Sequence, residues 1–319
     1  MITHPSLTLL STAFSREDLF LVVFCHVDDW MKRRFGSSNA PRQRRGPRDD
    51  EFADAEVLTV LLVGELCHCS REAAWLRQVR ASYRALFPAL PEKSRFGRRA
   101  AGARHLLPAR RATVLFWADA DLEPIRIMDS FPLSLCACYR IHPSNQPIDG
   151  SAFGRCASKR SFFFGLRPQL LITASGFIID LILAPGNCAD VTALGLYLDE
   201  CVEHGRELAG QIWLLDKGYR SERLRRGAQE RLGLTLVARQ QEPPGEPPTG
   251  WQLQLDALRR PIEGVLSLLT EGFSIEHLLA TTGIGLYRRA QAKATAFTLA
   301  RYFNRVLGLP PLDIARYAV

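Results

Sequence analysis

Ile125-Arg-Ile-Met-Asp-Ser-Phe-Pro-Leu133 is a short apolar segment, typical of a buried strand, that carries a single carboxylate at Asp129. An aspartate is rarely buried unless it has a partner or binds a metal. Two later segments repeat this pattern. An apolar run ends on Asp216 before a turn at Gly218, and Glu263 lies among the apolar residues of an amphipathic helical segment. Three acids on separate elements can meet around a divalent metal, and the rest of the sequence has to be consistent with that hypothesis.

The composition is that of an ordinary globular protein. The chain has 319 residues, of which 47% are hydrophobic and 23% charged, enough for a sizeable core and for two domains. No apolar run reaches the roughly 18 residues that span a bilayer. Residues 1–5 lack the basic start and the cleavage site of a secretory signal. We therefore expect a cytoplasmic protein with no membrane partner.

The eight cysteines include two closely spaced pairs, Cys67 with Cys69 and Cys136 with Cys138. Neither pair has the C-x2-C spacing of common zinc sites, and a reducing cytosol disfavours disulfides. We expect buried or idle thiols rather than a structural zinc site.

The formal net charge of +8 is concentrated near the N-terminus. Residues 1–111 hold 19 Lys and Arg against 12 Asp and Glu, whereas residues 112–319 hold 22 against 21. A basic module ahead of a balanced one indicates polyanion binding followed by catalysis. The preference for Arg over Lys has two explanations, bidentate phosphate contacts or the codon bias of a genome.

The first 120 residues predict helices. Ser15 is a suitable N-cap for a helix that continues to about residue 34, and helical spacing recurs over about 54–67, 70–83 and 95–117. The helices over 54–67 and 70–83 have the pattern of a helix-turn-helix, although many helix pairs that bind nothing share it. The basic side chains that we consider for DNA contact in this region are Arg77, Arg80, Arg98 and Arg99.

A basic loop is expected over residues 36–47, where Ser, Pro and Gly break the helical pattern. It is suited equally to phosphate contact and to plain solvent exposure. Its neighbourhood includes four arginines, Arg42, Arg44, Arg45 and Arg48.

From residue 124 the pattern changes to strands. Strands are expected over 125–133, 161–173, 176–183, 212–215 and 234–238, and helices over about 190–205, 221–229, 255–270 and 287–306. The strands over 161–173 and 176–183 should form a hairpin. This order is that of an RNase H-like fold, in which the first and fourth strands lie side by side. Asp129 and Asp216 would then be neighbours, and a helix packed on the sheet could bring Glu263 to them.

The predicted fold class is therefore α+β or α/β. A helical, basic, DNA-binding domain is expected over residues 1–120. An RNase H-like catalytic domain, with a mixed five-stranded sheet, flanking helices and C-terminal helices, is expected over residues 121–319.

Three carboxylates on a rigid scaffold suit two-metal phosphoryl transfer. Two Mg²⁺ ions about 3.5–4 Å apart can activate a water or a 3'-hydroxyl and stabilise the leaving oxygen. Each acid taken singly is better explained as a strand end or a surface helix residue, but their joint occurrence in this topology favours a metal site. Asp190 is an alternative second acid, although an N-cap role explains it. If Glu263 does not join the site, Asp190 and Glu271 are the next candidates.

Several motifs follow one another in a definite order. They are Met128-Asp-Ser-Phe-Pro132, Lys159-Arg-Ser-Phe-Phe-Phe-Gly165, Ala184-Pro-Gly-Asn-Cys-Ala-Asp-Val191, Asp216-Lys-Gly-Tyr219 and Arg259-Arg-Pro-Ile-Glu263. As an ordered set they resemble the DDE transposases of the IS982 group of insertion sequences, which are related to the IS4-type enzymes. Three N-terminal segments also fit, so that the resemblance covers nearly the whole chain: Phe52-Ala-Asp-Ala-Glu-Val57, Leu86-Phe-Pro88 and Ser94-Arg-Phe-Gly-Arg-Arg99.

The resemblance implies a metal-dependent transposase that cuts DNA at the terminal inverted repeats of its element and joins the freed 3'-hydroxyl ends to a target. By motif position, Asp129, Asp216 and Glu263 are the catalytic and metal-binding residues. The implied cofactor is Mg²⁺, two ions per site, with Mn²⁺ as a substitute. The implied partner is double-stranded DNA, both transposon ends and target, and a homodimer on paired ends is compatible with this activity.

The resemblance also assigns basic residues to DNA. Arg259 matches the basic position of the family's Arg-x3-Glu signature and would contact a phosphate, and Lys159 and Arg160 lie in a matching motif. Lys217 and Tyr219 suit either the same contact or a structural turn.

Two positions depart from the related enzymes. Thr270 stands where a Lys is usual, two helical turns after Glu263, and Asp256 stands where the IS4-type signature has Tyr. Loss of a phosphate-binding Lys should weaken DNA-end binding more than metal binding. Two alternative functions therefore stay open: a catalytically impaired copy that acts only as a DNA-binding protein, and a domesticated RNase H-like nuclease without strand transfer.

Overall fold

The computed structural model describes residues 4–318 except for residues 12, 42–50, 137–147, 149, 157–160, 241–248 and 281. The arginines of the predicted basic loop, together with Lys159 and Arg160, lie outside the described residues. Packing divides the chain into two compact units. Unit 1 comprises residues 1–118 and 269–319, and unit 2 comprises residues 119–268. Residues 269–319, which we expected in the catalytic domain, thus pack with the N-terminal helices.

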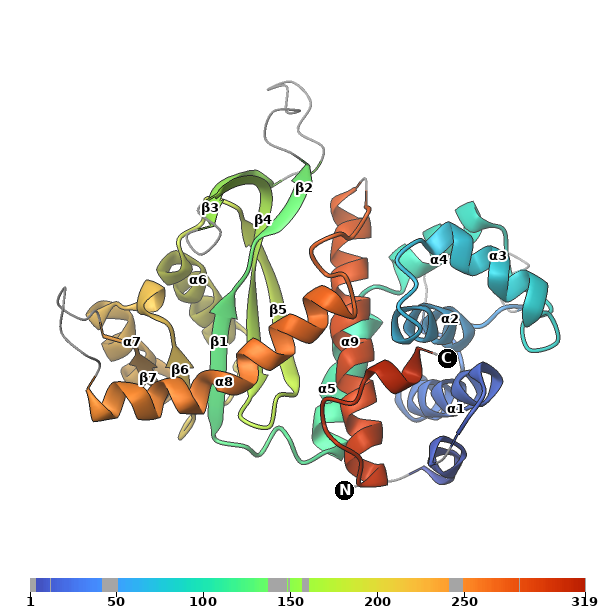
Figure 1. Ribbon diagram of the computed structural model, residues 1–319, viewed down its shortest axis with the longest axis horizontal. Coiled ribbons are helices and arrows are strands. Elements are labelled where there is room, and N and C mark those ends of the chain that lie inside the picture. Colours follow the sequence, from blue (N-terminus) through green and yellow to red (C-terminus); the bar gives the residue numbers. More distant parts are fainter. Residues whose placement is uncertain are drawn as a thin grey trace. The chain divides into compact units, whose positions relative to one another are not determined.

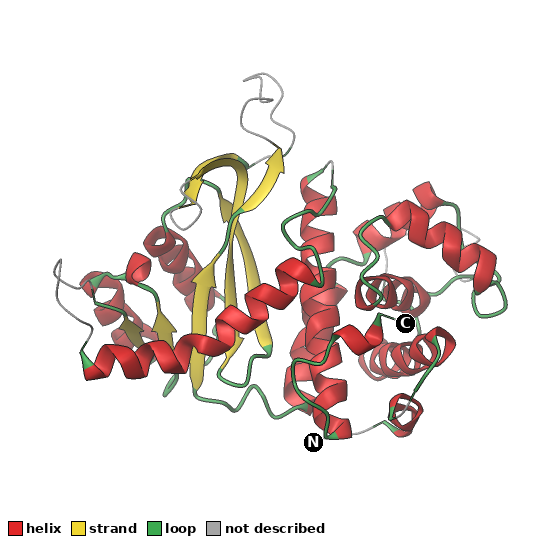
Figure 2. Ribbon diagram, in the orientation of Figure 1, coloured by secondary structure: helices red, strands yellow, loops and turns green. Residues whose placement is uncertain are grey.

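Unit 1 is helical (Figures 1 and 2). Its α-helices are α1 (Arg16–Phe35), α2 (Asp54–Leu66), α3 (Glu72–Ser82), α4 (Lys93–Gly102), α5 (Leu106–Trp117) and α9 (Gly283–Leu307). Ser15 caps α1 as predicted, because its hydroxyl accepts from the Asp18 amide while the Asp18 carboxylate accepts from the Ser15 amide. Helix α9 is buried almost continuously from Leu286 to Asn304, where α2 and α5 pack against it. It forms the core of this unit.

Helix α3 is shorter than the predicted span of about 70–83. The helix begins at Glu72, with Arg71 at the N-cap and no side-chain capping bond. It ends at Ser82, one residue before the predicted end.

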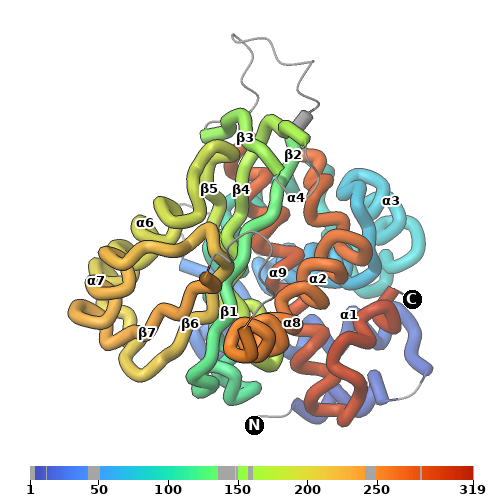
Figure 3. The backbone as a smooth tube through the Cα atoms, turned by 60° about the vertical axis from the view of Figure 1, so that its left-hand side comes forward, coloured from blue at the N-terminus to red at the C-terminus, as the bar shows by residue number. Residues whose placement is uncertain are grey.

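Unit 2 is built on one mixed sheet with helices on both faces (Figures 1 and 3). Its strands are β1 (Ile125–Ser130), β2 (Leu133–Cys136), β3 (Ala152–Cys156), β4 (Ser161–Thr173), β5 (Ile178–Pro185), β6 (Ile212–Leu215) and β7 (Thr235–Ala238). The sheet order is β2-β4-β1-β6-β7, and β3 and β5 also pair with β4. Three helices flank it: α6 (Asp190–Glu203), α7 (Glu222–Leu232) and α8 (Gly250–Glu271). The arrangement is that of an RNase H-like fold, as predicted.

Among the described residues, the sheet has seven strands where the sequence predicted five. The expected strand over 125–133 is interrupted at Phe131 and Pro132, after which Leu133 begins β2 and pairs with Leu166. Strand β3 was not predicted, because Ser151-Ala-Phe-Gly-Arg-Cys156 lacks β-branched residues and has a glycine in its middle. The predicted hairpin is confirmed: β4 and β5 pair antiparallel, and Gly176 makes their turn with φ +83°.

Candidate active site

The two aspartates of the hypothesis end neighbouring strands. Strands β1 and β6 are parallel, and Met128 of β1 lies opposite Leu215 of β6. Asp129 follows Met128 within β1, and Asp216 directly follows Leu215, the last residue of β6. Parallel strands in this register bring both carboxylates to the same edge of the sheet, as the sequence predicted.

Side-chain alternation places these carboxylates on one face. Met128 and Leu215 are buried in a cluster with Leu194 and Tyr197 of α6, on the face that α6 and α7 cover. Since successive side chains of a strand point to opposite faces, Asp129 and its counterpart after β6 face the other side. Helix α8 crosses that side (Figure 1).

Helix α8 supplies the third acid. Its buried residues Leu255, Ile262, Val265 and Leu269 recur at helical spacing and fix which side of the helix meets its neighbours. Arg259 lies beside this stripe, and Glu263 follows it by one turn on the exposed side. Seven residues line one open pocket of about 370 Å³: Asp129, Asp216, Arg239, Asp256, Arg259, Arg260 and Glu263.

Arg259 bridges the two aspartates. Its Nη2 lies 3.1 Å from Asp129 Oδ2, and its Nη1 lies 3.3 Å from Asp216 Oδ1. The arginine side chain is 11% exposed, so that these charge-assisted bonds are largely shielded from solvent. A single cation therefore holds two like charges together at the strand ends.

The carboxyl group of Asp129 has an unusual pKa of about 6, raised from an ordinary value of 3.8. Burial is the main cause, because it disfavours the charged form. Arg259 opposes this shift, and the nearby carboxylates of Asp216 and Asp190 add to it. The Ser130 amide donates to Asp129 Oδ1 at 2.8 Å and orients the carboxylate. A shifted carboxyl in a pocket is a common mark of a functional site.

The donor chemistry fits Mg²⁺ or Mn²⁺, which prefer carboxylate oxygens. Among the residues that the structure describes, however, no three acidic, histidine or cysteine side chains converge closely enough to form a ready metal cage. Arg259 lies between Asp129 and Asp216 and pairs with both. Glu263 lines the same pocket but is exposed.

The pocket contains two arginines that the sequence analysis missed. Arg239 directly follows β7, and its amide donates to the Leu215 carbonyl at 3.1 Å, which places it beside the end of β6. Its guanidinium pairs with Asp256 at 3.2 Å. Arg260 adjoins Arg259 in the helix. The sequence did contain a signal for Arg239. It directly follows a third predicted strand, just as Asp216 follows the strand before it. We overlooked it because we looked only for acidic residues at strand ends.

The predicted DNA-binding residues have different environments. Lys217 is exposed beside Asp216, and Arg77 and Arg98 are exposed on the helices of unit 1. Arg80 is half-buried, where it donates to the Pro91 carbonyl at 2.9 Å. Arg99 does not fit the expectation. Its side chain is 5% exposed and pairs with the buried Asp54 at 3.1 Å, so that it serves the interior of unit 1 and cannot reach a phosphate.

Asp190 is not the N-cap that we expected. Ala189 holds that position, and Asp190 is the first residue within α6. Its carboxylate instead lies within hydrogen-bond distance of Gln169 and near Arg167.

Comparison with known families agrees with this geometry. A family model described as "Transposase DDE domain" matches residues 119–280, just over half of the chain. The chain belongs to this family of transposase DDE domains. The match begins where unit 2 begins and includes the whole of the pocket. No curated protein and no solved structure was found to match the chain.

Membership in the transposase DDE family implies a DNA transposase, a metal-dependent enzyme that cuts and joins DNA. Within the described residues of this transposase, no helix combines the length and the apolar character needed to cross a membrane.

Proposed function

We propose that this transposase cuts the terminal inverted repeats of an insertion sequence of the IS982 group and joins the 3'-hydroxyl ends to target DNA. Asp129, Asp216 and Glu263 are the proposed catalytic and metal-binding residues. One observation carries the proposal: two aspartates end adjacent parallel strands on one face, and a glutamate from α8 lines the same pocket.

The proposed cofactor is a pair of Mg²⁺ ions, for which Mn²⁺ can substitute, and the pair would supply activation of the attacking oxygen and stabilisation of the leaving oxygen. The three carboxylates would hold the ions. Asp129 is mostly ionised at neutral pH, since its pKa is about 6. The paired strands β1 and β6 keep the carboxylates of Asp129 and Asp216 in fixed positions before DNA binds.

Arg259 has two roles in this proposal. In the metal-free protein it offsets part of the negative charge of Asp129 and Asp216. Its second proposed role is to bind a DNA phosphate bidentately at the pocket opening. Helix α8 positions it one turn from Glu263.

The DNA path proposed here uses exposed basic residues. Lys217 and Arg260 are exposed near the acids in unit 2, and Arg77 and Arg98 are exposed on unit 1. Lys159 and Arg160 are included on the resemblance alone. A cytoplasmic homodimer on paired DNA ends remains part of the proposal.

The departures at Thr270 and Asp256 leave the three carboxylates untouched. Asp256 pairs with Arg239 within the pocket, which gives it a use that a tyrosine would not have. We therefore propose an active copy, with weaker end binding than its relatives.

The test is a strand-cleavage and joining assay with Mg²⁺, on a DNA fragment that carries this coding sequence with its genomic flanks. The proposal predicts nicks at the element ends and products joined to a second DNA. Asp216→Asn should abolish both while DNA binding persists. Cleavage without joined products would indicate a nuclease. DNA binding without cleavage by the unaltered protein would indicate a DNA-binding protein. Either outcome contradicts the proposal.

A further inference from the structure

We propose that Tyr219, Gln169 and Asp190 form a positioning group that fixes the Asp216 turn, and with it the separation of Asp129 and Asp216. The inference rests on the proposed metal site. None of the three residues is proposed to touch metal or DNA. They act through the two aspartates.

The turn after β6 crosses the edge of the sheet. Asp216 lies on the face that α8 covers, and Lys217–Tyr219 form a single 3-10 turn. Tyr219 then enters the core on the opposite face, packed in the cluster that contains Met128 and Leu215, and it is 2% exposed. Because Tyr219 fixes the end of this turn, the backbone conformations available to its first residue, Asp216, are restricted.

Gln169 receives the anchor. The Tyr219 hydroxyl donates to Gln169 Oε1 at 2.5 Å. Gln169 is fully buried in β4, directly opposite Ser130, the residue after Asp129. The hydrogen bond therefore ties the turn that carries one aspartate to the strand that pairs with the other.

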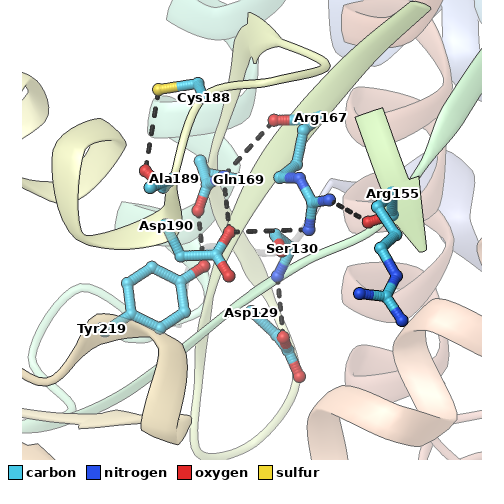
Figure 4. Close-up of polar contacts among 9 residues, drawn as sticks. All are labelled: Asp129, Ser130, Arg155, Arg167, Gln169, Cys188, Ala189, Asp190 and Tyr219. Carbon is cyan, nitrogen blue, oxygen red and sulfur yellow. Dashed lines mark hydrogen bonds and ion pairs between the residues drawn. The ribbon is translucent and has the colours of Figure 1, made fainter. Parts of the chain in front are cut away.

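Asp190 sets the orientation of the Gln169 amide (Figure 4). Gln169 Nε2 donates to Asp190 Oδ1 at 3.4 Å and to the Arg167 carbonyl at 3.3 Å, which leaves Oε1 directed at Tyr219. Without these two acceptors, nothing would favour the amide orientation that directs Oε1 at the tyrosine over the flipped one.

Asp190 also packs directly against the turn. A Cβ at Gly218 would lie only 2.8 Å from Asp190 Oδ2, closer than real side chains approach. The glycine between Asp216 and Tyr219 thus lets the carboxylate meet the turn backbone. The turn is held from two sides, by the tyrosine hydrogen bond and by this contact.

The first test is Tyr219→Phe, which removes the hydroxyl and keeps the ring. Tyr197→Phe is the matched control, since Tyr197 is buried in the same cluster and its hydroxyl donates to Asp180 at 3.0 Å, a carboxylate that does not line the pocket. Mn²⁺ affinity is measured by calorimetry on the full chain, and thermal unfolding is measured without metal. Both variants should unfold at lower temperature. Only Tyr219→Phe should bind Mn²⁺ more weakly, by about tenfold or more, as residues behind metal ligands commonly do.

The outcomes separate this inference from the proposed function. If the unaltered protein binds no Mn²⁺, the proposed metal site fails and the positioning group fails with it. If the unaltered protein binds Mn²⁺ and Tyr219→Phe binds it equally well, only the positioning group fails.

A second pair of variants covers the case in which Tyr219→Phe does not fold. Asp190→Asn keeps an oxygen that can accept from Gln169, whereas Asp190→Ala removes it. The inference expects Mn²⁺ affinity close to that of the unaltered protein for Asp190→Asn and an affinity about tenfold weaker for Asp190→Ala. Equal losses in both variants would mean that Asp190 acts through its charge, and the positioning role would be wrong.

Discussion

Arg259 Nη2 lies 3.1 Å from Asp129 Oδ2, and the same guanidinium reaches Asp216. Two aspartates at adjacent strand ends repel one another when both are ionised, and a cation between them relieves that repulsion. In this transposase a side chain therefore provides, without metal, part of the positive charge that a divalent ion would provide. Under the proposed function, Arg259 and the metal compete for the same carboxylates.

Replacement of Arg259 by Gln should strengthen metal binding. The variant removes the competing cation, and we expect Mn²⁺ affinity to rise about tenfold, equivalent to about 1.4 kcal/mol. Affinity for DNA should fall, because the proposed phosphate contact is lost. Calorimetric titration with Mn²⁺ checks the first effect. Arg231→Gln, which breaks an exposed pair with Asp199, is the control and should change neither. Unchanged or weaker Mn²⁺ binding in Arg259→Gln would rule out competition.

The raised pKa of Asp129 predicts a particular dependence of stability on pH. A carboxyl whose pKa is about 6 in the folded chain and near 3.8 in the unfolded chain binds its proton more tightly when folded. Its contribution to the free energy of unfolding is full below pH 4 and is lost as the pH rises through 6. Asp129→Asn lacks this loss. In metal-free buffer it should match the unaltered protein near pH 4 and exceed it by about 1–3 kcal/mol at pH 7.5.

Denaturant titrations of both proteins across that range measure the difference. A constant offset between them from pH 4 to pH 7.5 would show that Asp129 titrates normally.

Arg98 and Arg99 should differ sharply although they are neighbours. Arg99→Ala leaves Asp54 buried without its cation and should cost about 3–5 kcal/mol of stability. Arg98→Ala should leave stability unchanged. If Arg98 contacts a phosphate, its loss should reduce the slope of log affinity against log salt by about 0.9. Urea unfolding and DNA binding at several salt concentrations test the pair, and a stability loss in Arg98→Ala would contradict the assignment.

Much of the site followed from sequence because its two aspartates end strongly apolar strands. The short apolar run over 212–215 predicted β6 with its observed bounds. The order of the elements predicted that β6 lies beside β1. The helix spacing also held a signal that we did not use. Arg99 follows Phe96 by three residues and precedes Ala103 by four, both buried, and this marks it as an inward position.

Other features depend on three-dimensional partners that no local pattern records. The burial of α9 on nearly all sides leaves no amphipathic stripe to indicate which unit it joins. The pairing of Arg259 with both acids, and of Gln169 with Tyr219, joins residues more than 40 positions apart. The extra strand β3 forms by pairing with an edge of β4, and the local sequence of β3 does not predict this pairing.

The most direct test of the account is a Mn²⁺ titration of four single variants of the full chain, Asp129→Asn, Asp216→Asn, Glu263→Gln and the control Asp199→Asn. Asp199 is exposed and does not line the pocket, so that its loss should leave affinity unchanged. The account predicts that each of the other three weakens Mn²⁺ binding by at least about tenfold, including Glu263→Gln, whose carboxylate is exposed in the metal-free chain. Binding by Glu263→Gln at the affinity of the unaltered protein would contradict a site made of these three acids.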